Sequence, residues 1–227
     1  MRKAAIVLVI LAILALGSDL VLGSVAEARL AEVAQNRLGL THRPTVDLEG
    51  FPFFLYAVRR RFPAASLEVR DIRARGLTVD RFTLELRDVR LDSMAALTGG
   101  EGTITASRGR GTVEVTQESL GAYLERVGVP FRIEFVGSSR VRVSGTATAL
   151  GKDVEASAEG ELAVTEGSLE FRPERIQVGD GTRVPPSALA FRVDLPEVVP
   201  RLAYDGITVE GGRAILAFRI RGAVVPL

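Results

Sequence analysis

The amino-acid sequence predicts a single α+β domain with an N-terminal hydrophobic helix, a long antiparallel sheet and a mid-chain helix that covers part of the sheet. Three observations lead to this fold class. Residues 1–23 join a basic head to an apolar run, the chain from Ser66 onward alternates apolar and charged residues, and residues 116–128 interrupt that alternation with helical spacing. The length of 227 residues allows one sizeable core and an N-terminal appendage.

The N-terminal segment, residues 1–23, has the pattern of a signal sequence or of an uncleaved membrane anchor. Arg2 and Lys3 precede a run from Ala4 to Leu16 that contains only Ala, Ile, Val and Leu, as in a secretory signal. Extended to Leu22 across Asp19, the run could just cross a bilayer as a helix. The basic end predicts that the rest of the chain lies in the cell envelope, at the outer face of the cytoplasmic membrane, or is secreted after cleavage.

Whether this segment is cleaved stays open in the sequence, because small-residue sites occur at 21–23 and 26–28. We favour an uncleaved anchor, because residues 24–40 have the spacing of a helix that continues from the membrane. The apolar face of that helix is predicted to contain Val25, Leu30, Val33, Leu38 and Leu40.

The body of the chain, residues 24–227, is predicted to form one domain with nine or ten strands. The alternation begins at Leu67 and Val69 and continues through Phe82, Leu84 and Leu86, with charged residues between them. Gly-containing turns separate the strands. Because so many one-sided strands share only two substantial helices, the sheet must curl on itself or leave a groove. A groove lined by aliphatic side chains suits acyl chains.

Residues 116–128 are predicted to form an amphipathic helix, with Thr116 as the N-cap and Gly128 as the stop. The apolar stripe of this helix is expected to contain Leu120, Tyr123, Leu124 and Val127. A second, very short helix is expected within residues 196–203.

An aromatic and basic segment, "GFPFFLYAVRRRFP", joins the N-terminal helix to the first expected strand. We expect its apolar side chains either to plug the end of the sheet or to touch the boundary between acyl chains and headgroups. The three arginines that follow form either a solvated basic turn or contacts to lipid phosphate, since a planar guanidinium pairs well with phosphate.

Several stretches in order resemble a known family: "VDLEGFPFF", "GLTVDRFTLELRDVRLD", "GTVEVTQESLGAYL" and the closing residues from 195 onward. Together they resemble the LmeA-like phospholipid-binding family of bacterial cell-envelope proteins, over roughly residues 20–227. The resemblance implies a fold similar to tubular lipid-binding (TULIP/BPI-like) domains, in which a long curved antiparallel sheet wraps around a helix. It also implies binding of phospholipid and, for some members, a part in maturing lipid-linked mannan.

The resulting hypothesis is non-catalytic binding, with or without transfer, of a phospholipid or a lipid-linked glycan precursor, in support of envelope glycolipid or lipomannan biosynthesis. The expected lipid-binding residues are Phe51, Phe53, Phe54, Leu55, Leu84, Leu86, Leu124 and Phe218, and the expected headgroup contacts are Arg59, Arg60 and Arg61. The alternative is a membrane-anchored interaction protein that docks an envelope biosynthetic enzyme without a bound lipid.

Composition argues against the other classes of function. The absence of Cys excludes disulfides, thiolate catalysis and a lipid-modified N-terminal Cys, and the single His42 cannot build a His-rich metal site, so we expect neither metal nor cofactor. A net charge of +1 provides no field for nucleic acid. Acidic residues alternate with arginines along the strands, as on a solvated sheet face, and no nucleophile elbow occurs, so we do not expect an enzyme.

Overall fold

A computed structural model describes residues 2–74, 76–129, 131–137, 140–149, 152–178, 184–195 and 202–226, with the backbone alone for 2–16, 74, 147–149, 152, 202, 225 and 226. Its helices are α1 (Arg2–Leu38), α2 (Phe53–Arg59) and α3 (Gln117–Arg126), with the short 3-10 helices η1 (Met94–Thr98) and η2 (Pro186–Ala188). The strands are β1 (Thr45–Glu49), β2 (Arg61–Ala74), β3 (Leu77–Leu91), β4 (Thr103–Thr116), β5 (Arg132–Phe135), β6 (Arg140–Ala149), β7 (Lys152–Thr165), β8 (Ser168–Val178), β9 (Phe191–Asp194), β10 (Leu202–Glu210) and β11 (Arg213–Pro226).

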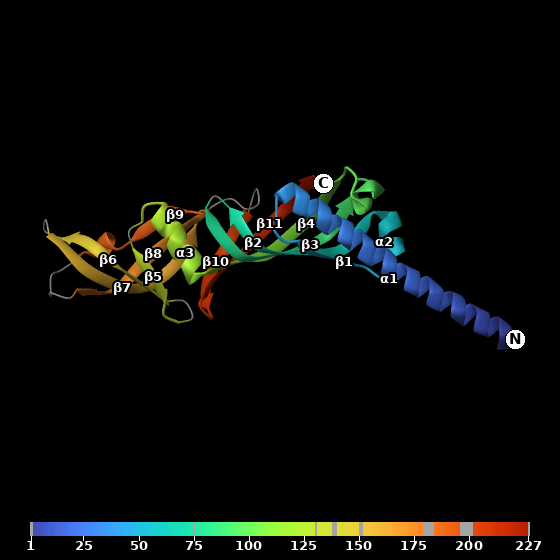
Figure 1. Ribbon diagram of the computed structural model, residues 1–227, viewed down its shortest axis with the longest axis horizontal. Coiled ribbons are helices and arrows are strands. Elements are labelled where there is room, and N and C mark those ends of the chain that lie inside the picture. Colours follow the sequence, from blue (N-terminus) through green and yellow to red (C-terminus); the bar gives the residue numbers. More distant parts are fainter. Residues whose placement is uncertain are drawn as a thin grey trace. The chain divides into compact units, whose positions relative to one another are not determined.

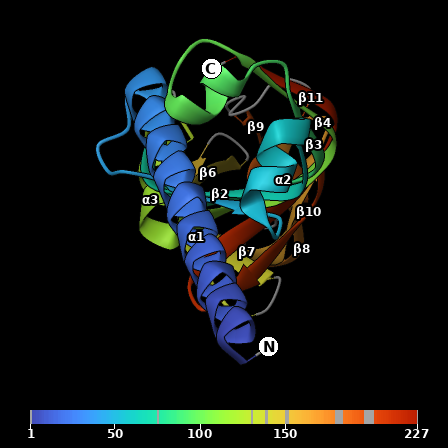
Figure 2. The same ribbon diagram turned by 90° about the vertical axis from the view of Figure 1, so that its right-hand side faces the viewer.

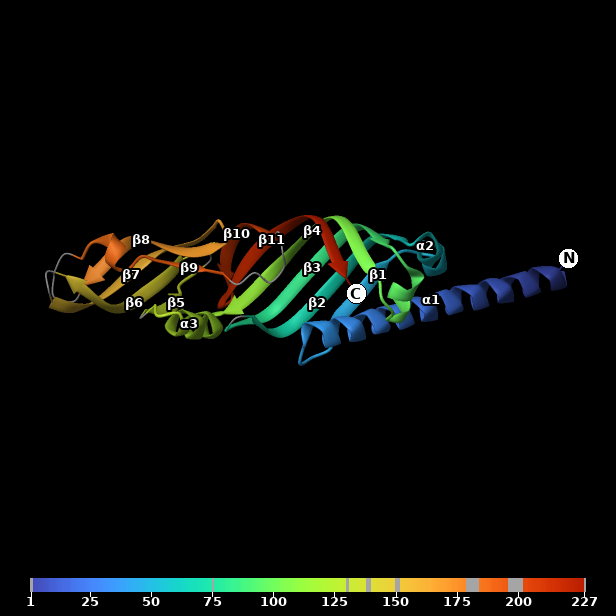
Figure 3. The same ribbon diagram turned by 90° about the horizontal axis from the view of Figure 1, so that it is seen from above.

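The strands form two sheets (Figures 1 and 3). A six-stranded sheet has the order β1-β2-β3-β4-β11-β10, and a five-stranded sheet has the order β5-β6-β7-β8-β9. The described registers of β1 with β2, β10 with β11 and every neighbouring pair from β5 to β9 are antiparallel. The prediction of an α+β fold with curled antiparallel sheets is therefore confirmed, whereas a sheet wrapped around a helix and the likeness to tubular lipid-binding domains stay predictions.

The chain divides into two compact units. Unit 1 comprises Met1–Val69, Thr83–Arg110 and Arg221–Leu227, and unit 2 comprises Arg70–Phe82 and Gly111–Ile220. The six-stranded sheet supplies strands to both units, and the five-stranded sheet belongs to unit 2.

In unit 1, α1 packs against β1, α2 and η1 (Figure 2). The buried face of α1 consists of three small residues, one leucine and one carboxylate: Asp19, Gly23, Ala26, Leu30 and Ala31. From Asp19 to Leu30 the spacing is three or four residues, which is that of one helix face. The predicted apolar face was therefore right for Leu30 and wrong for Val25 and Leu38, which are 53% and 61% exposed.

Small residues on α1 allow a close approach of its backbone to α2. A Cβ added at Gly23 would lie 3.4 Å from the Phe53 ring. Beneath α2, the Phe53 and Phe62 rings pack with their centroids 5.5 Å apart. The apolar side of the strands completes this core with Leu48, Ala64, Val89 and Leu91, all buried.

In unit 2, α3 confirms the predicted mid-chain helix. The Ser119 amide donates a hydrogen bond to the Thr116 hydroxyl at 3.2 Å, which is the expected N-cap. Leu120, Tyr123 and Leu124 are buried as predicted, but Val127 lies at the C-terminal end of α3 and is 46% exposed. The Tyr123 hydroxyl donates to the Asp194 carbonyl at 2.9 Å, which ties α3 to β9.

Four short elements were not predicted: β1, α2, η1 and η2. The short helix expected within residues 196–203 falls outside the described residues up to 201, and Leu202 and Ala203 belong to β10. The predicted signal or anchor, residues 1–23, consists largely of residues for which the structure describes the backbone alone, and it stays a prediction. Within the part of the chain that the structure describes, no helix is both long and apolar enough to cross a bilayer.

Candidate functional site

An open cleft of about 1080 Å³ lies in unit 2, where α3 faces the strands β5 to β8. Gly121 of α3 and Ile133 of β5 line the cleft where the helix meets the sheet. A Cβ added at Gly121 would be 4.0 Å from the Ile133 side chain. The lining residues are Gln117, Glu118, Gly121, Glu125, Val129, Phe131, Arg132, Ile133, Ser144, Gly145, Thr146, Glu155, Ala156, Ser157, Gln177 and Val178. The cleft falls at the upper end of the size range of small-molecule sites.

The lining of the cleft is amphipathic because two rows of opposed residues reach it. The row formed by Gly145, Ala156 and Val178 across β6, β7 and β8 carries small or aliphatic side chains. The neighbouring row, Arg132, Ser144, Ser157 and Gln177, is polar. Atoms of both rows line the cleft, so its surface offers apolar contact and hydrogen-bonding groups together.

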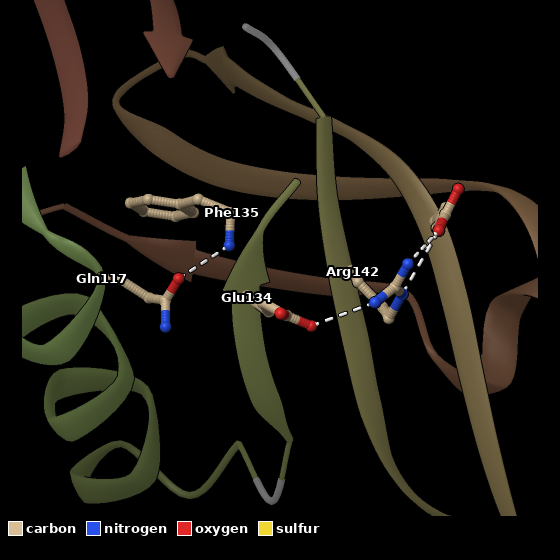
Figure 4. Close-up of polar contacts among 5 residues, drawn as sticks. Gln117, Glu134, Phe135 and Arg142 are labelled. Carbon is tan, nitrogen blue, oxygen red and sulfur yellow. Dashed lines mark hydrogen bonds and ion pairs between the residues drawn. The ribbon is translucent and has the colours of Figure 1, made fainter. Parts of the chain in front are cut away.

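The walls of the cleft are joined by polar contacts that Figure 4 shows. The Phe135 amide donates to the Gln117 side-chain oxygen at 2.8 Å, so the first turn of α3 is tied to β5. On β6, Arg142 reaches Glu134 at 3.1 Å and Glu159 at 2.6 Å, which links β5, β6 and β7. The hydrogen bond to Glu159 raises the pKa of Arg142, and the same contact lowers the pKa of Glu159.

Four of the described residues that line the cleft are charged: Glu118, Glu125, Arg132 and Glu155. Within the described part of the chain, no hydrogen bond or ion pair is made by the side chains of Glu118, Glu125, Arg132 or Glu155. Arg132 is the one cation among the described lining residues, and a guanidinium is suited to a phosphate or carboxylate oxygen.

A second, apolar crevice in unit 2 is essentially filled. Its volume is about 10 Å³, room for no more than about one water molecule. It is lined by Leu77, Val113, Val115, Leu120, Leu169, Leu195, Tyr204, Ile207, Ala214 and Leu216. Burial raises the pKa of the Tyr204 phenol, in keeping with these apolar surroundings. An acyl chain could enter here only if the lining side chains moved apart.

The inward-facing residues that the sequence predicted as lipid contacts lie in packed cores. Leu84 and Leu86 are buried in unit 1, and Leu124 and Phe218 are buried in unit 2. The Phe218 ring stacks on Phe82 with a centroid distance of 5.5 Å. None of the four lines the cleft or the crevice.

The aromatic segment divides into inward and outward residues. Phe53 is 8% exposed and packs on Phe62, and Leu55 is half-buried, whereas Phe51 and Phe54 are 61% and 54% exposed. The bend before α2 requires Gly50, whose φ is 154° and where a Cβ would lie 2.7 Å from the Tyr56 ring.

The arginines that follow this segment are also not equivalent. Arg60 has a left-handed backbone, ends α2, and donates from its guanidinium to the Asp92 carbonyl at 2.5 Å. The side chains of Arg59 and Arg61 are exposed and make no hydrogen bond or ion pair with the described residues. The predicted site residues therefore lie in three places: the core of unit 1, the core of unit 2 and the exposed surface of the aromatic and basic segment. The sequence analysis did not identify the residues of the cleft.

A family model for LmeA-like phospholipid-binding proteins matches residues 17–219. The chain belongs to the LmeA-like phospholipid-binding family. The resemblance found in the sequence is thereby confirmed, and the match to this LmeA-like chain includes Asp19 and the part of α1 that packs on unit 1. No curated protein and no solved structure matches the chain.

Proposed function

We propose that this LmeA-like protein binds one phospholipid, or a lipid-linked glycan precursor, without catalysis, and that the cleft of unit 2 holds it. The observation that carries the proposal is the amphipathic cleft of about 1080 Å³ in a member of a phospholipid-binding family. A phospholipid needs apolar contact for its acyl chains and hydrogen bonds for its head region, and the two rows of the cleft offer both.

Binding in this cleft requires no covalent step. Val129, Phe131 and Val178, which are half-buried, would contact acyl methylenes, each of which contributes about 0.8 kcal/mol when removed from water. Arg132 would contact a phosphate oxygen through a charge-assisted hydrogen bond. The hydroxyl and amide groups of the polar row would accept or donate hydrogen bonds to ester or sugar oxygens.

The proposal places the protein in the bacterial cell envelope, attached by an uncleaved α1. The packing of α1 supports retention of the helix, because cleavage at 21–23 or 26–28 would remove Asp19 and Gly23, which are buried against unit 1. Transfer of the bound lipid, and supply of lipid for glycolipid or lipomannan assembly, are the roles that we propose for such a membrane-held binding protein.

The test compares lipid retained by two variants at one position. Gly121→Ala adds a methyl group that meets nothing closer than 4.0 Å, so it preserves the cleft and serves as the matched control. Gly121→Trp places a large ring in the cleft and obstructs part of it. Each full-length variant is extracted from membranes in mild detergent and purified, and its lipid is measured by mass spectrometry.

We expect about one phospholipid per chain above the detergent background in the wild type and in Gly121→Ala, and loss of that lipid in a folded Gly121→Trp. Equal lipid in both variants would show that the cleft does not hold it. A folded wild type without stoichiometric lipid would favour the alternative of a docking protein for an envelope enzyme.

A further inference from the structure

We propose that an exposed corner of unit 1 inserts into the surface of a bilayer that contains anionic lipid. The apolar corner is defined here as the exposed turn of α1 that carries Leu20, Val21 and Leu22, together with Phe51, Phe54 and Val58 at α2. This proposal deepens the proposed function, because it assigns a membrane-contacting surface, and it does not depend on the cleft of unit 2.

The two halves of the apolar corner are held together by direct contacts. The backbone amides of Phe53 and Phe54 donate to the Asp19 carboxylate at 2.6 and 2.8 Å, and Leu20 follows Asp19 in the chain. The helices α1 and α2 lie side by side in both views (Figures 1 and 2). The start of α2 is thereby fixed beside the turn of α1 that carries Leu20 and Leu22.

The corner is exposed even though α2 packs on the core of unit 1. Helix α2 buries Phe53 and Ala57 on its inner face, yet its outer face carries Phe54 and Val58, which are 54% and 69% exposed. A short helix that is apolar on both faces exposes large hydrophobic side chains only at a cost in water, so such a patch indicates a contact surface.

Two features identify the partner as a lipid bilayer. The first is continuity, because Leu20 and Leu22 extend the run from Ala4 to Leu16, which contains only Ala, Ile, Val and Leu. The second is charge, because Arg59 follows Val58 directly, and the exposed side chains of Arg59 and Arg61 make no hydrogen bond or ion pair with the described residues. Aromatic side chains with adjacent arginines are the usual composition at an anionic membrane interface.

The experiment uses the absence of cysteine, which permits a single labelled position in the full chain. Phe54→Cys carries an environment-sensitive dye, and Leu38→Cys is the matched control. Both positions are exposed apolar residues of unit 1, and Leu38 lies about 28 Å along α1 from Asp19 at ~1.5 Å per residue. The labelled proteins are reconstituted in phosphatidylcholine–phosphatidylglycerol vesicles, with and without nitroxide-labelled acyl chains.

We expect nitroxide lipids to quench the dye at residue 54 several-fold more strongly than the dye at residue 38. Replacing Arg59 and Arg61 by Gln should reduce quenching at residue 54 in the anionic vesicles and not in pure phosphatidylcholine, whereas the control Arg37→Gln should change neither. Equal quenching at residues 54 and 38, or none at 54, would overturn the proposal and leave a protein as the partner of the corner. The lipid count of the Gly121 variants is independent of this result, so failure of one proposal is distinguishable from failure of the other.

Discussion

Removal of the Asp19 carboxylate is the most informative perturbation of unit 1. Asp19 is 4% exposed and accepts hydrogen bonds from the first two amides of α2, at 2.6 and 2.8 Å. The residue before α2, Pro52, provides no side-chain cap, so Asp19 takes the place of an N-cap residue from another helix. Loss of this carboxylate leaves both amides without an acceptor from α1.

The expected magnitude follows from these two contacts. A hydrogen bond to a charged group contributes about 1.5–3 kcal/mol, and removal of the buried carboxylate also removes its desolvation cost, so we expect Asp19→Ala to destabilise α2 by about 3 kcal/mol. Asp19→Asn keeps one acceptor oxygen and should cost about half as much. A change of 3 kcal/mol corresponds to a roughly 100-fold larger equilibrium constant for the local opening of α2.

Hydrogen exchange of the α2 amides, followed by mass spectrometry of the full chain, measures this opening. The control is Glu32→Ala, an exposed carboxylate of α1 that pairs with Arg29 at 2.9 Å and should cost less than about 1 kcal/mol. If Asp19→Ala and Glu32→Ala exchange at the same rate in α2, the inference that Asp19 holds α2 against α1 is wrong.

Three further predictions test α1, a glycine of β7 and the Arg142 network. A chain that begins at residue 29 lacks Asp19, Gly23 and Ala26, so we expect fast exchange in α2, and the protein isolated from membranes should have the intact mass of the full chain; a stable, fully protected shortened chain would contradict this. Gly160→Ala would place a Cβ 2.1 Å from the Arg172 carbonyl oxygen at a register shift, so we expect a loss of about 2 kcal/mol or more in thermal unfolding. Its control, Gly206→Ala, also lies at a register shift but meets nothing within 4 Å, and equal losses would refute the steric explanation. The pKa of Glu159 is lowered by its hydrogen bond to Arg142, so the stability advantage of wild type over Glu159→Gln should be complete above the ordinary value of 4.5 and should shrink as the pH falls below it. An advantage that does not change with acidification would contradict that linkage.

The sequence predicted those elements whose determinants are local. The alternation from Leu67 to Leu86 lies on β2 and β3, and the Thr116 cap begins α3, because a period of two or a side chain three residues away is visible in a short window. Helix α2 escaped prediction because its cap is Asp19, 34 residues before Phe53 in the chain. The buried face of α1 was misjudged because small residues, not the larger Val25 and Leu38, allow close packing.

The sequence predicted the kind of site, one that binds lipid, but not the residues that line the cleft. The sequence by itself determined an α+β protein of a phospholipid-binding family, because strand periodicity and the order of the family's segments are properties of the linear chain. Only the tertiary structure decided that Leu124 and Phe218 are core, and that residues from α3 and four strands line one cleft. It also decided that Phe54 is exposed while Phe53 is buried. Alternation says which residues share a face of a strand, but the opposing elements decide whether that face is packed, hollow or open to a partner.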